Sequence, residues 1–289
     1  MKNNFSKRYL VKGDFSIQQT ETSYKGKMTR KESEKILENE KLKLRQLQEK
    51  LYADGSQSLL IIIQAMDAAG KDSLIEHVFE GVNPQGCEVT SFKAPNIKEY
   101  GHDFLWRHYL ALPDKGKIGI FNRSHYESVL ACKVHPEFNL KEKVWDDVKD
   151  FDHDFWEERY ESIRDFEKHL TRNGTRIIKI FLNVSKKEQK KRFLDRIDQN
   201  EKNWKFSLND LPERELFDQY MEAYEKAINE TTAKHAPWYV IPADNKWLAR
   251  TAAIQIIVDN LEDMKLEFPE LPEEEAAKLQ QARLKLESE

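Results

Sequence analysis

Short apolar runs separated by turn residues divide the chain into alternating strands and helices. Leu59 to Ile63 are consecutive large aliphatic residues, mostly β-branched, which is typical of a central parallel strand covered by helices on both faces. Further strands are expected at 87–92, 118–121, 176–184 and 238–241. The alternation predicts an α/β fold, a three-layer arrangement in which a doubly wound parallel sheet is flanked by helices.

Helical periodicity and capping residues predict the helices between these strands. Thr29 and Glu32 form a candidate capping box, and the helix that follows is expected to end at Asp54-Gly55. Ser185 and Glu188 form a second candidate box. Further helices are expected over about 97–110, 146–167, 213–232 and 247–264.

The same pattern indicates one main domain with two appended segments. Residues 1–28 are polar and aperiodic, so we expect an N-terminal extension, whereas 29–265 carry the strand–helix alternation. Residues 266–289 are rich in glutamate and predict a loosely packed helix or a disordered acidic tail.

Composition narrows the class of protein. The formal net charge of −4 over 289 residues excludes a globally basic nucleic-acid binder. Cys87 and Cys132 are too few for a disulfide framework or a cysteine-rich zinc site, which favours a reducing compartment. The polar start has no secretory signal and no apolar run is long enough to span a membrane, so we expect a cytoplasmic protein without a membrane partner.

The segment after the first strand has the features of a phosphate-binding loop. Its small residues and the polar residues that follow are Ala65, Ala68, Ala69, Gly70, Lys71, Asp72 and Ser73. Small residues let main-chain N–H groups approach a phosphate, the helix start adds its positive dipole, and Lys71 would reach the phosphates directly. The match to G-x-x-x-x-G-K-[ST] is imperfect, because Ala65 replaces the first glycine and Asp72 the hydroxyl residue. An ordinary strand–turn–helix with a solvated lysine is the alternative.

Carboxylates near this loop point to a metal-bridged phosphate. Asp67 would repel an anion inside the cradle unless Mg²⁺ lay between them. The strand at 118–121 ends in Asn122 and Arg123, and ligands of open α/β sheets bind at this strand end. Asn122 offers a metal only a neutral oxygen, so Glu127 is the candidate replacement carboxylate. Arg123 is a candidate clamp for the transferred phosphate.

A basic stretch near residue 190 predicts a mobile lid. Arg192 and Arg196 lie four residues apart on one helical face, and the segment 200–213 reads as a loop between two helices. A solvated helix with pairs such as Glu188 with Arg192 is the alternative. Lys133 extends the cationic set or is merely solvated.

Other conspicuous residues have plainer interpretations. The acidic segment 146–167 is read as an amphipathic helix with a solvated face, because no His or Cys cluster accompanies it. His125 is expected to form hydrogen bonds rather than to carry a phosphoryl group, since in-line transfer needs no covalent intermediate. Phe104 is equally a core residue or a platform for a base.

The motifs of the chain resemble family-two polyphosphate kinases over about residues 10–265. The segments that carry the resemblance are 65–72, 83–86, 103–107, 121–127, 186–196, 201–206 and 236–239. The resemblance implies a P-loop kinase fold with a helical lid over about 185–232. It also implies Mg²⁺-dependent transfer between inorganic polyphosphate and nucleotides, with Mn²⁺ as an alternative metal, by a homo-oligomer, either a dimer or a tetramer.

The resemblance also assigns roles to residues. Asp67 would sit between the reacting phosphates and the metal, with Glu127 as a second metal ligand. The implied polyphosphate-binding set is Lys71, Arg123, Lys133, Arg192 and Arg196, and the implied nucleotide-binding set is Asp67, Phe104, Arg107, Asn122 and Glu127. Class I members carry Asp and Asn where this chain has Asn122 and Glu127, and the pattern here is similar to class III, whose members accept both AMP and ADP to give ADP and ATP.

Three other classes of function compete with this interpretation. An ATP-dependent nucleoside monophosphate kinase shares the loop, lid and sheet, but it requires a pocket for the donor adenine. A non-catalytic nucleotide or phosphate sensor is the second alternative. A nucleic-acid binder acting through the basic helix is the third, and no groove-reading motif supports it.

Overall fold

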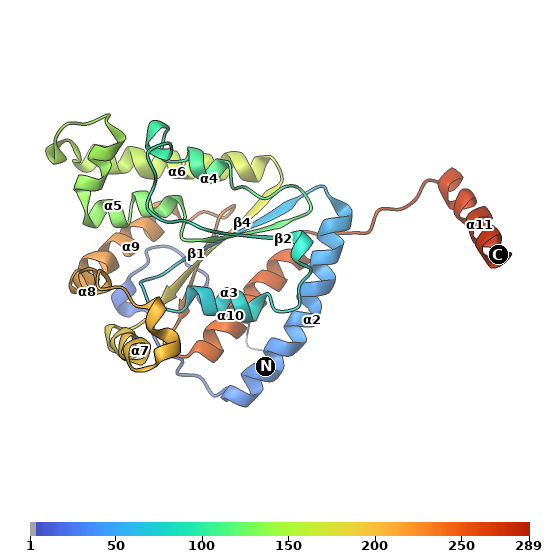
Figure 1. Ribbon diagram of the computed structural model, residues 1–289, viewed down its shortest axis with the longest axis horizontal. Coiled ribbons are helices and arrows are strands. Elements are labelled where there is room, and N and C mark those ends of the chain that lie inside the picture. The colour runs from blue at the N-terminus through green and yellow to red at the C-terminus, as the bar shows by residue number, and fades with distance from the viewer. Residues whose placement is uncertain (1–3) are drawn as a thin grey trace.

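The computed structural model describes residues 4–289 and contains one five-stranded, all-parallel sheet with helices on both faces (Figure 1). The strands are β1 (Ser58–Gln64), β2 (Cys87–Ser91), β3 (Ile118–Asn122), β4 (Thr175–Asn183) and β5 (Trp238–Pro242), in the spatial order β2-β3-β1-β4-β5. Strand β1 lies at the centre, and all seven of its residues are buried. The predicted fold class is confirmed.

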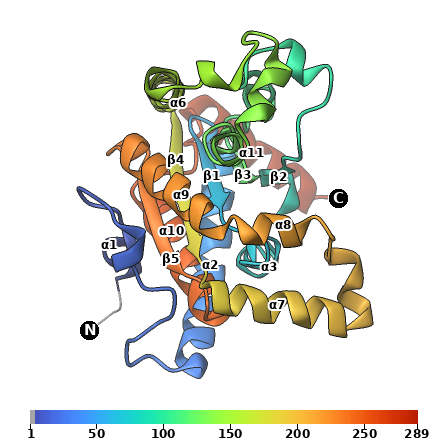
Figure 2. The same cartoon turned by 90° about the vertical axis from the view of Figure 1, so that its left-hand side faces the viewer.

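The helices form the outer two layers. Helices α2 (Arg30–Asp54), α3 (Lys71–Val78) and α10 (Lys246–Glu262) cover one face of the sheet, while α6 (His153–Arg172) and α9 (Phe217–Thr231) pack together on the other (Figure 1). The short helices α4 (Trp106–Tyr109) and α5 (Ala131–Val134) lie near α6. Helices α7 (Lys186–Asp198) and α8 (Asp210–Glu215) stand in front of the carboxyl ends of the strands (Figure 2).

Helix boundaries follow local side-chain hydrogen bonds. The Thr29–Glu32 capping box is present, and the predicted start of α2 is correct. The second box is only half formed, because the carboxylate of Glu188 binds Arg192 instead, and the N–H of Ser185 donates to Asp244. Helix α6 begins later than expected, at His153, because the Asp152 carboxylate caps the N–H of Phe155.

The helix expected over 97–110 is wrong in its first half. Asn96 and Glu99 each bind the other's main-chain N–H, and the carboxylate of Asp103 accepts from the N–H of Leu105. These local bonds compete with helical ones. A 3₁₀ turn at Glu99–Gly101 and the short α4 replace the long helix.

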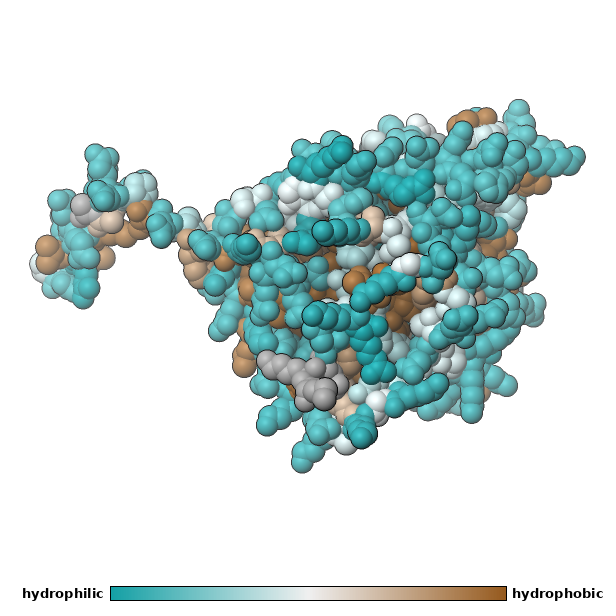
Figure 3. All heavy atoms as spheres, turned by 180° about the vertical axis from the view of Figure 1, so that it is seen from behind, coloured by the Kyte–Doolittle hydropathy of each residue, from teal (hydrophilic) through white to brown (hydrophobic). Residues whose placement is uncertain are grey.

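Both ends of the chain contain helices. Helix α1 (Phe5–Tyr9) packs against α10 and β5 with Phe5 and Tyr9 buried, so the segment expected to be an extension joins the core. Helix α11 (Glu273–Glu287) stands apart from the body and exposes Leu279, Leu284 and Leu286 (Figures 1 and 3). Within residues 4–289, no helix combines the length and apolar character needed to cross a membrane.

Candidate functional site

The loop between β1 and α3 has the backbone of an anion cradle. Ala68 and Gly70 adopt left-handed conformations, with φ values of 60° and 108°. Gly70 is the N-cap of α3, so this helix begins directly on the loop. At Gly70 the positive φ restricts the position to glycine, because side chains with a Cβ rarely adopt it. The sequence placed this strand, turn and helix correctly.

Lys71 folds back over the loop. Its Nζ donates to the carbonyl of Ala65 at 2.7 Å and to that of Met66 at 3.3 Å, and its side chain is buried. Burial, and then the neighbouring charge of Arg123, lower the pKa of Lys71 to about 8, although Asp67 raises it in part. The ammonium group is therefore held at the loop by two main-chain carbonyls.

Arg192 is the second cation at the loop, and it is fixed rather than mobile. Its guanidinium donates to the carbonyls of Ala68 and Ala69, at 3.2 and 2.6 Å, and to those of Ala243 and Asp244, at 2.6 and 3.2 Å. Its Nε binds Glu188 at 2.9 Å, and the side chain is buried. In this structure its donors join the loop to the segment that follows β5.

Arg196, one turn further along α7, has fewer protein partners than Arg192 and is more exposed. Its Nη1 donates to the carbonyl of Lys205 at 3.0 Å and lies 3.8 Å from Asp210. Its side chain keeps 23% of its surface exposed. Arg196 therefore lines the cationic side of the site with part of its surface open to solvent.

Arg123 joins the two predicted carboxylates. Its Nη2 lies 2.5 Å from Asp67 and its Nη1 lies 3.6 Å from Glu127. The charge of Glu127, more than that of Asp67, raises the pKa of Arg123. Burial raises the pKa of Asp67, but Lys71 and Arg123 together hold it below its usual range. Asp67, Arg123 and Glu127 therefore lie at one place, which we call the junction.

Other predicted residues surround the junction. The amide of Asn122 donates to the carboxylate of Asp72 at 2.6 Å, which ties the end of β3 to the first turn of α3. The hydroxyl of Ser73 accepts from Arg250 at 2.8 Å. Asp72 and Ser73 thus line the site through side chains that already have protein partners.

Two cavities meet at the junction. One, of about 540 Å³, contains the phosphate loop, and we call it the cationic groove; its Lys and Arg residues are Lys71, Lys93, Arg123, Arg192, Arg196, Lys202, Lys205 and Lys246. The other, of about 570 Å³, we call the aromatic pocket; its aromatic residues include Phe92, Tyr100, Phe104, Phe138 and Tyr220. Asp67 and Arg123 line both cavities.

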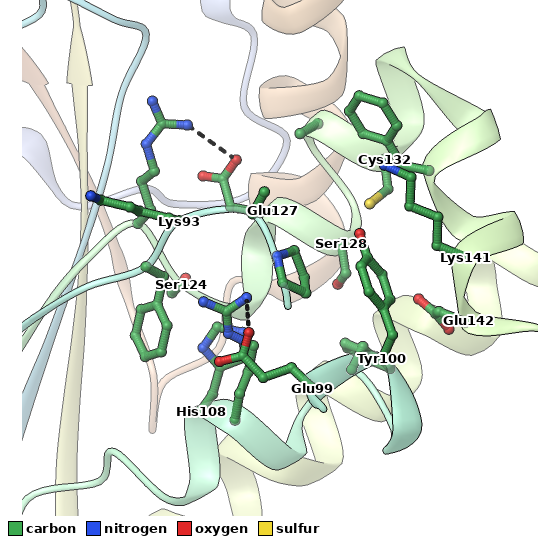
Figure 4. Close-up of a pocket in the computed structure, with 18 of the residues that line it drawn as sticks. Lys93, Glu99, Tyr100, His108, Ser124, Glu127, Ser128, Cys132, Lys141 and Glu142 are labelled. Carbon is green, nitrogen blue, oxygen red and sulfur yellow. Dashed lines mark ion pairs between the residues drawn. The ribbon is translucent and has the colours of Figure 1, made fainter. Parts of the chain in front are cut away.

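The aromatic pocket is walled by fixed side chains (Figure 4). Arg107 pairs with Glu99 at 3.3 Å and lies over the ring of Phe92, 5.2 Å from its centroid. Arg159 packs against Phe104, with its guanidinium carbon 4.4 Å from the ring centroid. Phe104 thus lies in the pocket wall, which favours the base-platform interpretation over the core interpretation.

Two residues that the sequence singled out lie elsewhere. Lys133 lines neither cavity, because its Nζ lies over the rings of Trp156 and Tyr160. Its side chain is thus engaged by two aromatic rings outside both cavities. His125 is buried, 3.5 Å from Glu167, and burial lowers the pKa of the imidazole. This placement excludes direct attack on a bound phosphate in this conformation.

Sequence reasoning missed several lining residues. Lys93 and Lys246 line the cationic groove, and each lies just past the carboxyl end of a strand, β2 and β5 respectively. Their positions could have been used to predict them as site residues, because ligands of open α/β sheets bind at the carboxyl ends of the strands. Tyr100, Phe138 and Tyr220 gave no local signal, because distant segments bring them together in the aromatic pocket.

The residues present fit a magnesium ion held jointly with a substrate. Among the described residues, no three His, Cys, Asp or Glu side chains gather closely enough to hold a metal by themselves. Mg²⁺ usually takes one or two carboxylates together with water and substrate phosphates. Asp67, with 34% of its side chain exposed at the junction of both cavities, can provide such a ligand.

A central parallel sheet, a phosphate loop and two cavities joined by charged residues define a phosphotransferase of the P-loop kinase class. Residues 27–269 match the family model "Polyphosphate kinase 2 (PPK2)". The chain belongs to the polyphosphate kinase 2 family, whose members are phosphotransferases that generally need a divalent metal.

Named relatives of the chain support its place in the polyphosphate kinase 2 family. The chain is 50% identical to an ADP-polyphosphate phosphotransferase of Rhodopseudomonas palustris, an alignment that covers 87% of this chain and 86% of the relative. It is 46% identical to an AMP/ADP-polyphosphate phosphotransferase of Meiothermus ruber, over 82% and 84% of the two chains. The crystal structure of polyphosphate kinase 2 from Arthrobacter aurescens superimposes with a TM-score of 0.88 at 38% identity, over 97% and 96% of the two chains.

Proposed function

We propose that this protein transfers phosphoryl groups from inorganic polyphosphate to AMP and to ADP, giving ADP and ATP. Polyphosphate would lie in the cationic groove and the nucleotide in the aromatic pocket. The observation that carries the proposal is the junction, because Asp67 and Arg123 line both cavities. A donor in one cavity and an acceptor in the other would therefore react at the same pair of side chains.

The residues of the junction supply what in-line transfer needs. Arg123 and Lys71 place positive charge where the oxygens of the transferred group would lie, and such fixed charges stabilise the transition state. Asp67 would hold Mg²⁺, with Glu127 as a second carboxylate released from Arg123. When bound, the metal neutralises phosphate oxygens and orients them. Mn²⁺ prefers similar oxygen ligands and is expected to substitute.

The aromatic pocket favours a nucleoside as acceptor. Phe104, which lines this cavity and has the Arg159 guanidinium against its ring, would provide a stacking surface for a base. Arg107 is close enough to the same cavity to contact a ribose or an α-phosphate. Asn122, where class I members of the family carry a carboxylate, is consistent with acceptance of both AMP and ADP.

The proposal is tested by comparing phosphate donors. Purified protein is incubated with Mg²⁺ and AMP, with either polyphosphate or ATP as the donor, and nucleotides are separated by chromatography. We expect ADP, and then ATP, from polyphosphate. Turnover from ATP alone would replace the proposal with an ATP-dependent monophosphate kinase, and binding without turnover would favour a sensor.

A further inference from the structure

Trp204 is the most exposed aromatic side chain at the cationic groove, and the face of its ring has nothing to stack on in polyphosphate. It belongs to a 3₁₀ helix (Asn200–Lys205) between α7 and α8, exposes 78% of its surface and lines the groove together with Lys71. Polyphosphate is a chain of charged oxygens without an apolar face. An indole beside it would gain no stacking and would stay in contact with water.

The neighbours of Trp204 are those of a nucleotide site. Lys205 lies over the indole, with Nζ 4.9 Å from the ring centroid, and Lys202 and Lys246 line the same cavity. A flat apolar surface among cations suits a ligand with one aromatic end and one anionic end. The cavity, at about 540 Å³, is close in volume to the aromatic pocket, at about 570 Å³.

Because of this arrangement we propose that the cationic groove also accepts a nucleoside diphosphate as phosphoryl donor. The base would stack on Trp204, and the phosphates would lie along the groove toward Lys71 and Arg123. With ADP also in the aromatic pocket, the protein would convert two ADP into AMP and ATP without polyphosphate. This proposal rests on the proposed function, because it uses the same junction and the same acceptor site.

The chemical step balances without any further reactant. A terminal oxygen on the β-phosphate of the acceptor ADP attacks the β-phosphorus of the donor ADP. The bond from that phosphorus to its bridging oxygen breaks, and the electron pair leaves with AMP. The new bond gives ATP, so the phosphoryl group crosses the junction just as it would from polyphosphate.

The test measures two reactions with each of four proteins. Wild type, Trp204→Ala, Trp204→Phe and Leu208→Ala are incubated with Mg²⁺ and ADP alone, or with Mg²⁺, ADP and polyphosphate. Leu208 is the matched control, because it is equally exposed, at 78%, follows Trp204 closely and does not line the groove. A preparation of Lys71→Ala reveals any contaminating adenylate kinase, since it should yield no ATP from ADP alone.

We expect wild type to form AMP and ATP in equal amounts from ADP alone. Trp204→Ala should lower this rate about tenfold relative to the polyphosphate-driven rate, as loss of one stacked base does, whereas Trp204→Phe should restore most of it and Leu208→Ala should change neither. Absence of ATP from ADP alone, with polyphosphate-driven synthesis intact, would overturn this inference and leave the proposed function standing. Equal loss of both reactions in Trp204→Ala would make Trp204 a general lid contact. Failure of polyphosphate-driven synthesis in wild type would overturn the proposed function itself.

Discussion

A guanidinium nitrogen of Arg123 lies 2.5 Å from a carboxylate oxygen of Asp67. The two side chains come from adjacent strand ends, since Asp67 follows β1 and Arg123 follows β3. In the proposed reaction, Asp67 must exchange part of this contact for a metal ion, and Arg123 must exchange part of it for a phosphoryl oxygen. We therefore expect the Asp67–Arg123 ion pair to separate, at least in part, when metal and substrate bind.

Replacement of Asp67 tests its role as a metal ligand. Asp67→Asn should lower turnover by about 10² or more, since it removes the charge that organises metal and phosphate. Residual activity should require much more Mg²⁺ than wild type, which is measured by titrating the metal at fixed polyphosphate. Asp154→Asn is the control, because Asp154 lies on α6 with its side chain 91% exposed. If Asp67→Asn shows the same Mg²⁺ dependence as wild type, this carboxylate is not a metal ligand.

The depressed pKa of Lys71 predicts a pH dependence. Only the ammonium form carries the charge that attracts phosphate, and its pKa is lowered to about 8. The group is therefore charged below pH 8 and neutral above it. Values of kcat/KM for polyphosphate, which report ionisations of the free enzyme, should fall by about tenfold per pH unit well above 8.

Lys71→Arg provides the control for this profile. A guanidinium stays charged over the measured range, so the fall above pH 8 should disappear from whatever activity remains. The same inflection in Lys71→Arg would assign it to another group. Lys71→Ala should lose about 10² or more in turnover at every pH.

Alanine substitutions of Arg192 and Arg196 should have different effects, the first on stability and the second on polyphosphate binding. Arg192→Ala leaves the carbonyls of Ala69, in the loop, and Ala243, just after β5, without their donor, so the free energy of unfolding should fall by about 3 kcal/mol, as for a broken buried pair. Arg196→Ala should change this free energy by less than about 1 kcal/mol. It should instead weaken polyphosphate binding and flatten the plot of log affinity against log salt by about one unit.

Urea denaturation and polyphosphate titration at several salt concentrations decide between these roles. Equal unfolding midpoints for Arg192→Ala and wild type would contradict the structural role of Arg192. If the polyphosphate affinity of Arg196→Ala depends on salt as that of wild type does, Arg196 does not bind polyphosphate and α7 presents an ordinary charged surface.

Phe104 should act on the acceptor alone. Phe104→Ala should raise KM for AMP by about tenfold, the usual effect of losing one stacked base, without changing KM for polyphosphate. Phe104→Tyr keeps the ring and is expected to behave like wild type. A rise in both KM values would place Phe104 in the support of the whole site rather than at the base.

Local patterns were sufficient to predict the sheet and the loop. The run Leu59–Ile63 had no polar interruption, and it is the fully buried centre of the sheet. The small residues after it and Gly70 predicted a turn, and Gly70 supplies the left-handed end of that turn. Strand ends then located Asn122 and Arg123 without any knowledge of contacts.

Features that depend on distant partners were not predictable. Arg192 is held by hydrogen bonds to the carbonyls of Ala243 and Asp244, which lie about 50 residues later in the chain, so no local pattern could indicate them. Helix α1 is too short for periodicity to appear, yet Phe5 is fully buried against the rest of the fold. The charge of Lys133 was visible in the sequence, whereas its contacts with the rings of Trp156 and Tyr160 were not.

The central claim is that phosphate passes directly from polyphosphate to the nucleotide at the junction of Asp67 and Arg123. Phosphorus NMR of one mixture of protein, Mg²⁺, polyphosphate and AMP follows donor and acceptor together. We expect that each phosphate lost from the chain appears as a new phosphoanhydride in ADP or ATP, without orthophosphate, and that Asp67→Asn stops both changes. Release of orthophosphate with AMP unchanged, or an intact polyphosphate chain, would contradict it.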